Sequence, residues 1–118
     1  MRENVVLQKT YSFAVMITKF CFEIQQNKKE FVILSTNLLK SGTSIGANVE
    51  EAQGAISKAE FIAKMQIALK EAKETKYWLR LIKDANVYRN EKSETLLQEC
   101  NEIIQLITSI LKTAKANR

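Results

Sequence analysis

Apolar residues recur at intervals of three and four along four long stretches of this chain, and no proline interrupts any of them. This spacing places apolar side chains on one face of an α-helix. Proline inside such a stretch would remove a backbone donor and break the helix. The alternation of polar and apolar residues that is typical of a half-buried strand is absent. The pattern therefore predicts an all-α protein.

Short polar or glycine-containing segments separate the four stretches. The predicted helices cover approximately residues 7–26, 29–53, 58–85 and 92–114. Breaks are expected at 27–29, at Gly54, and at a turn marked by Asn86 and Asn90. Ser57 followed by Glu60 has the spacing of a capping box, which favours the start of the third helix directly after Ser57.

The apolar stripes predict the core and the way the helices pack. The expected core positions are Phe13, Ile17, Phe20, Ile24, Phe31, Leu34, Leu38, Ile45, Val49, Ala52, Phe61, Met65, Ala68, Ala72, Thr75, Leu79, Ile82, Leu96, Cys100, Ile103, Ile107, Ile110 and Ala114. Four long helices with short connections favour an antiparallel up-and-down four-helix bundle. We expect one domain over residues 1–118.

Composition argues against most catalytic chemistry. The 118 residues include no histidine, so the commonest general base and metal ligand is missing. Carboxylate pairs that hold Mg²⁺ in helical bundles have counterparts in Glu71 with Glu74 and Glu99 with Glu102. A helical wheel, however, places Glu99 and Glu102 off the apolar seam. We therefore expect no enzyme activity, metal, cofactor or small-molecule substrate.

The two cysteines and the apolar runs indicate the compartment. Cys21 and Cys100 lie in apolar stripes, and their separation fits no metal-binding motif, so buried free thiols are predicted. Free thiols suit a reducing cytoplasm. The N-terminal apolar run is too short for a signal peptide, and no run approaches the ~18 residues of a membrane span. The expectation is a soluble cytoplasmic protein without a membrane partner.

Basic residues gather on one flank of the third predicted helix. Eighteen Lys and Arg against thirteen Asp and Glu give a net charge of +5, which favours acidic partners. Lys73, Lys76, Arg80 and Lys83 are spaced by three and four, so all four could point one way. They are candidates for contacts with nucleic-acid phosphates, where each cation adds affinity by counterion release. Alternatively, the flank is a solvated face with Glu–Lys pairs.

The opposite flank of the same helix carries a second apolar strip, formed by Ile67, Trp78 and Leu81. A helix that is apolar on more than one side is either deeply buried or makes a second contact. Deep burial of one helix is difficult in a four-helix monomer. The strip therefore predicts a homo-oligomer with Trp78 at or near the interface. The alternative is that Trp78 caps the edge of the bundle.

The segment from Lys40 to Ala52 is rich in poor helix formers, yet the apolar stripe passes through it. Gly42 and Gly46 are four residues apart, which lets another backbone approach closely. Asn48 and Glu51 lie near the stripe, and they are candidate buried polar groups that need partners.

Glu71 and Glu74, beside Trp78, form a second polar cluster. One interpretation is that these glutamates bond with Asn48 and Glu51 across helices and fix the register of the bundle. The other is that the four residues have a direct functional role.

Two motifs carry a family resemblance. They are Ser-Gly-Thr-Ser-Ile-Gly-Ala-Asn over residues 41–48 with Glu51-Ala52, and Phe61 followed by Glu-x-x-Glu-Thr-x-Tyr-Trp-Leu over residues 71–79. With them the chain resembles, over nearly its whole length, four-helix-bundle proteins first noticed as reading frames in intervening sequences of bacterial 23S rRNA genes. These are often labelled S23 ribosomal protein. Lys40 departs from the arginine more usual in the family, which keeps the charge but loses a bidentate fork.

The resemblance implies an antiparallel four-helix bundle and assembly into a barrel-shaped homopentamer. It also implies a link to nucleic acid, because a similar pentameric accessory protein of diversity-generating retroelements binds nucleic acid and works with a reverse transcriptase. Two functions stay open. The first is a non-enzymatic oligomer that binds RNA or another nucleic acid through the basic flank. The second is a protein-interaction scaffold that binds no nucleic acid.

Overall fold

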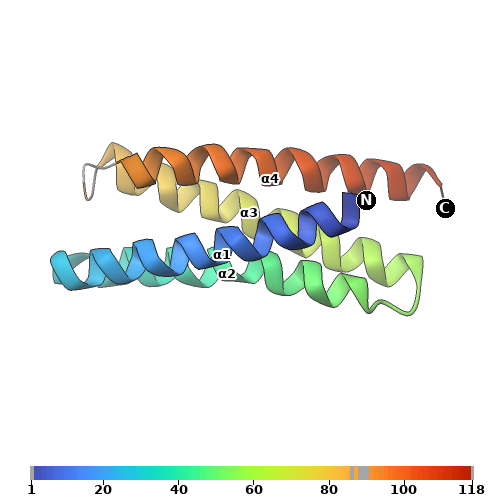
Figure 1. Cartoon of the computed structure of the whole chain (residues 1–118), viewed down its shortest axis with the longest axis horizontal. Coiled ribbons are helices and arrows are strands. Elements are labelled where there is room, and N and C mark those ends of the chain that lie inside the picture. Colours follow the sequence, from blue (N-terminus) through green and yellow to red (C-terminus); the bar gives the residue numbers. More distant parts are fainter. Residues whose placement is uncertain (1, 86, 88–90, 118) are drawn as a thin grey trace.

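A computed structural model, which describes residues 2–85, 87 and 91–117, gives an all-α fold. Its α-helices are α1 (Arg2–Asn27), α2 (Val32–Gln53), α3 (Lys58–Asp84) and α4 (Glu91–Ala116). Successive helices run in opposite directions and form an elongated bundle of 47 × 20 × 19 Å (Figure 1). The predicted antiparallel up-and-down four-helix bundle is confirmed. The predicted turn at Asn86 and Asn90 lies outside the described residues.

Two predicted helix starts were wrong. The first helix begins at Arg2 and not near Leu7, because the buried residues Val6 and Thr10 continue its stripe toward the N-terminus. The second helix does not begin at Lys29. A short 3-10 turn, η1 (Lys29–Phe31), precedes it and turns the chain back before α2 starts.

The predicted ends around the α2–α3 connection are confirmed. Gly54 is the C-cap of α2, with ordinary negative φ of −95°. Ser57 is the N-cap of α3, and its hydroxyl accepts a hydrogen bond from the backbone N–H of Glu60 at 3.1 Å. The Glu60 carboxylate accepts a hydrogen bond from the N–H of Ile56 at 3.5 Å. In the usual capping box this second bond comes from the N–H of the N-cap residue, which here is Ser57.

The core follows the predicted stripes along most of each helix. Phe31, Leu34, Phe61 and Ala114 are exceptions, because they are only partly buried at its margin. At the start of α3 it is Ile62, 6% exposed, that enters the core in place of Phe61. Position 62 is three residues and position 61 four residues before the buried Met65, so both spacings fit the apolar stripe and packing selects Ile62. Cys21 and Cys100 are buried free thiols, as predicted, and desolvation raises both pKa values to about 12.

The glycines of α2 form a close seam with α1. A Cβ atom added at Gly42 would lie 2.8 Å from Cγ2 of Ile17, and one added at Gly46 would lie 3.3 Å from the backbone oxygen of Thr10. The predicted close approach of another backbone is therefore confirmed, and α1 supplies it. This packing compensates for the poor helix propensity of the segment.

Several polar side chains of the same segment bond back to their own helix. Hydroxyl or amide groups donate to carbonyl oxygens three or four residues earlier, in the pairs Ser41–Leu38, Thr43–Leu39, Ser44–Lys40 and Asn48–Ser44. These bonds pair the donors within the helix itself, so a polar sequence can remain helical here.

Candidate nucleic-acid interface

A groove lies between α3 and α4 and contains three of the four predicted cations. Lys76, Arg80 and Lys83 line it from α3, and the open hollow has a volume of about 540 Å³. Its α4 wall consists mainly of polar side chains: Glu94, Leu97, Gln98, Asn101, Glu102 and Gln105. We call this hollow the basic groove. It combines positive charge on the α3 side with amides and two carboxylates on the α4 side.

The fourth cation, Lys73, lies in an adjoining hollow of about 320 Å³ between the same two helices. Lys70 of α3 and Lys115 of α4 also line this second hollow. Lys73, Lys76, Arg80 and Lys83 are spaced by three and four, so they form one stripe along α3. The cationic surface therefore extends beyond the basic groove toward the far end of the α3–α4 pair.

Most of this charge has no carboxylate partner. Lys83 pairs with Glu94 of α4, with 3.1 Å between Nζ and Oε1. Among the described residues, no ion pair joins Lys73, Lys76 or Arg80 to a carboxylate. A Glu–Lys pair of the kind expected for a solvated flank is thus present at Lys83, and the other three cations have no carboxylate partner among the described residues.

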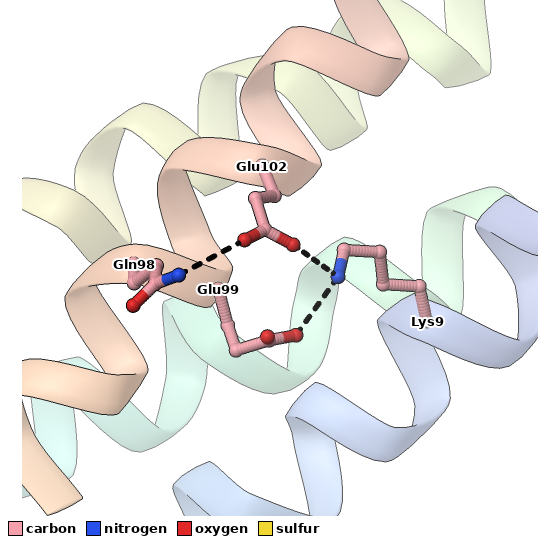
Figure 2. A network of polar contacts seen from close by, with 4 residues as sticks. All are labelled: Lys9, Gln98, Glu99 and Glu102. Carbon is pink, nitrogen blue, oxygen red and sulfur yellow. Dashed lines mark hydrogen bonds and ion pairs between the residues drawn. The ribbon is translucent and has the colours of Figure 1, made fainter.

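Next to the groove, Lys9 of α1 is held between two carboxylates of α4 (Figure 2). Its Nζ lies 2.8 Å from Oε1 of Glu102 and 2.9 Å from Oε1 of Glu99. The bond to Glu102 raises the pKa of Lys9, and the same bond lowers the pKa of Glu102. The other Glu102 oxygen accepts a 3.5 Å hydrogen bond from Nε2 of Gln98, a residue that lines the groove. We call these three charged residues the Lys9 latch.

The latch also bears on the carboxylate pairs weighed as Mg²⁺ ligands. Glu99 and Glu102 direct oxygens at the Lys9 ammonium, which occupies the position a cation would need. Within residues 2–85, 87 and 91–117, His, Cys, Asp and Glu side chains nowhere gather in a group of three or more that could hold a metal ion.

The second apolar strip of α3 is partly exposed. Ile67 is 42% exposed, whereas Trp78 and Leu81 are half-buried. Trp78 packs against the core, donates from Nε1 to Oε2 of Glu74 at 3.3 Å, and meets the ring of Tyr77 edge-on at 5.1 Å. Within one chain Trp78 is therefore half-buried at the edge of the bundle, and the strip leaves apolar surface exposed.

The expected bonds among Asn48, Glu51, Glu71 and Glu74 are not present in the described part of the chain. Asn48 donates to the Ser44 carbonyl, and Glu51 pairs with Lys64 at 2.7 Å. Asn48 and Glu51 therefore bond to Ser44 and Lys64, and not to Glu71 and Glu74.

Another pair of residues supplies a buried polar contact between α2 and α3. The hydroxyls of Ser41 and Thr75 lie 3.0 Å apart, and both residues are buried. Thr75 was predicted as a core position, but its hydroxyl partner was not.

Sequence reasoning also missed the α4 wall of the groove. Gln98, Asn101 and Gln105 are spaced by three and four, which would have indicated one amide stripe on α4. Lys9 carried no such signal, because its partners are about ninety residues away in the sequence.

Fold and surface together define a class: an antiparallel four-helix bundle with long helices and a polar, cation-lined groove between its last two. Comparison with known proteins narrows the class. The profile of the 23S rRNA-intervening sequence protein family matches residues 2–109, and the chain belongs to this family.

Among solved structures, the chain is similar to a protein of unknown function from the S23 ribosomal protein family of Bacteroides thetaiotaomicron. The two are 43% identical, with a TM-score of 0.88, and the match covers 95% of this chain and 99% of the other. The search of curated proteins gave no significant match. Among the described residues, none of the helices is long and apolar enough to cross a bilayer.

Proposed function

We propose that this protein is a non-enzymatic, oligomeric helical bundle that binds RNA along the α3–α4 face. The observation that carries the proposal is the row of Lys73, Lys76 and Arg80. These cations lie along one helix edge without a carboxylate partner among the described residues. Each such cation that meets a phosphate releases condensed counterions and so contributes affinity.

The opposite wall of the groove suits the same ligand. The amides of Gln98, Asn101 and Gln105 both donate and accept hydrogen bonds, so they suit sugar hydroxyls and base edges beside the phosphates. Among the residues that the structure describes, no aromatic side chain lines the basic groove, so base stacking there is expected to contribute little. Binding is therefore expected to depend strongly on salt and weakly on sequence.

Self-association is the second part of the proposal. The strip of Ile67, Trp78 and Leu81 leaves apolar surface on the flank of α3 away from the cations, and the family resemblance implies a homopentamer. Copies joined through this strip would present several basic grooves at once, which raises avidity for a long polyanion without any new contact.

The binding test uses fluorescence anisotropy with a labelled RNA oligonucleotide at low salt. A variant with Lys73, Lys76, Arg80 and Lys83 all changed to Gln should bind on the order of tenfold or more weakly. The matched control changes Lys19, Lys28, Lys29 and Lys40 to Gln, which removes the same number of exposed charges from the α1–α2 half. Equal losses in both variants, or no binding by the parent, would contradict RNA binding at this face.

Light scattering after size exclusion tests the assembly. Ile67→Glu places a charge on the exposed strip and should dissociate the oligomer, whereas Ile33→Glu, at a 73% exposed position on α2, should not. A monomeric parent protein would refute self-association. RNA binding would then still be tested by the anisotropy experiment.

A protein-interaction scaffold is the second candidate function. Tyr11 and Phe22 are 63% and 62% exposed on α1, and Val15 between them is 37% exposed. Their spacing of four and seven puts them on one helix face. Partners that co-purify with the protein after nuclease treatment, and are lost with Phe22→Ser, would favour this function over RNA binding.

A further inference from the structure

We propose that Lys9 is a positioning residue of the basic groove: it holds Glu99 and Glu102 and keeps their negative charge from opposing an RNA phosphate. Lys9 belongs to α1 and does not line the groove. The inference rests on the proposed function, because it assigns an electrostatic role at the face where RNA is expected to bind.

The charges along the groove explain why such a residue is needed. Lys76, Arg80 and Lys83 supply positive charge, while Glu94 and Glu102 bring two carboxylates into the same lining. Glu94 already pairs with Lys83. Without Lys9, the charge of Glu102 would offset a second cation of the groove and leave little net attraction for a phosphate.

Lys9 supplies part of the missing neutralisation from outside, because its single positive charge lowers the net charge of the two carboxylates from −2 to −1. One Glu102 oxygen bonds Lys9 and the other accepts from Gln98, so the carboxylate is fixed between α1 and the groove (Figure 2). Glu99 also directs an oxygen at the Lys9 ammonium. Neither carboxylate is then free to turn its full charge toward a ligand.

The bond from Gln98 gives the latch a second effect on the groove. The amide nitrogen of Gln98 donates one hydrogen bond to Glu102 at 3.5 Å, which favours one orientation of a side chain that lines the groove and leaves its second N–H and its oxygen for a ligand. Loss of Lys9 would release Glu102 and, through it, Gln98. Both changes weaken RNA binding, the first by repulsion and the second by loss of a fixed polar contact.

The latch acts on the groove through the charge of Glu102. Glu102 and Lys76 line the same hollow, so a phosphate bound there would meet both charges. At physiological salt, charges interact over a screening length of about 8 Å. Lys9 is only 23% exposed, so salt screens the latch less than it screens a freely solvated pair.

The experiment measures RNA affinity by fluorescence anisotropy at low salt, with the same labelled RNA oligonucleotide. Lys9→Gln should weaken binding by about fivefold, because it exposes two carboxylates as well as removing one cation. The matched control Lys28→Gln removes one exposed cation from the α1–α2 end, and it should change affinity by less than about twofold. Lys9→Arg keeps the charge and should bind like the parent protein.

A rescue variant separates electrostatics from a purely structural role. Adding Glu99→Gln and Glu102→Gln to Lys9→Gln removes the charges that Lys9 holds and changes the net charge of the cluster from −1 in the parent to 0, so this triple variant should bind at least as tightly as the parent. Circular dichroism establishes that each variant is folded.

The outcomes distinguish this inference from the proposed function. If the parent binds RNA but Lys9→Gln behaves like Lys28→Gln, or the triple variant stays as weak as Lys9→Gln, the role of Lys9 is refuted and RNA binding stands. If the parent does not bind RNA at all, both fail together.

Discussion

The two sides of α1 are joined to the bundle in different ways. Toward α2, Gly42 and Gly46 let the helices approach until Ile17 and the Thr10 backbone fill the space a side chain would take. Toward α4, charged groups bridge the helices, through the Lys9 latch and through Lys92 with Glu23 at 2.7 Å. The first contact is governed by shape and the second by charge. They should therefore respond to different perturbations.

The largest effect is expected on the glycine side. Gly42→Ala places a methyl group 2.8 Å from Ile17, a buried and branched residue that cannot yield easily. Overpacking typically costs about 1–3 kcal/mol, from which about 1 kcal/mol of improved helix propensity must be subtracted. The free energy of unfolding should fall by up to about 2 kcal/mol, measured by urea denaturation, and the loss should not depend on salt.

Gly54→Ala is the control for this substitution. The nearest atom to its added Cβ is a backbone oxygen at 3.8 Å, so the change should be close to neutral. If Gly42→Ala proves as mild as Gly54→Ala, the close seam is not a determinant of stability.

A smaller effect is expected on the charged side. Lys9→Gln removes the latch, whose partners Glu99 and Glu102 are 31% and 44% exposed. Partly exposed ion pairs contribute about 1 kcal/mol or less, and salt weakens them. The loss of unfolding free energy should therefore be largest at low salt and shrink near 1 M NaCl. A loss that is independent of salt would mean that Lys9 stabilises the bundle by packing.

The smallest effect is a change in pH dependence. The Lys9 ammonium lowers the pKa of Glu102 in the folded state, so its contribution is present above the ordinary value of 4.5 and is lost as pH falls through the lowered pKa. Glu102→Gln imitates the protonated form. The parent should therefore be more stable than Glu102→Gln at pH 7, and the difference should vanish in acid. Thermal melts at both pH values measure it, and a constant difference would contradict this assignment.

The sequence predicts the fold well because helix periodicity is local. Spacings of three and four were sufficient to place most of the core, the Ser57 cap and the cationic stripe of α3. The start of α1 was missed because Thr10, a polar residue, occupies a core position and bonds its own Val6 carbonyl. Its hydroxyl is satisfied within the helix, which a hydropathy pattern does not reveal.

Contacts between distant helices were harder to predict. The Lys9 latch depends on the register of α1 against α4, which packing of the whole bundle decides. The same limit applies to Asn48 and Glu51, whose residue types indicated a need for partners but not which partners they take.

RNA binding along α3 and α4 is tested most directly by the salt dependence of affinity. Each phosphate contact to a single strand contributes about −0.7 to the slope of log K against log salt concentration. Changing Lys76, Arg80 and Lys83 to Gln should therefore reduce the slope by about two, whereas changing Lys28, Lys29 and Lys40 to Gln should leave it unchanged. An unchanged slope in the groove variant, or an equal reduction in both, would contradict binding at this face.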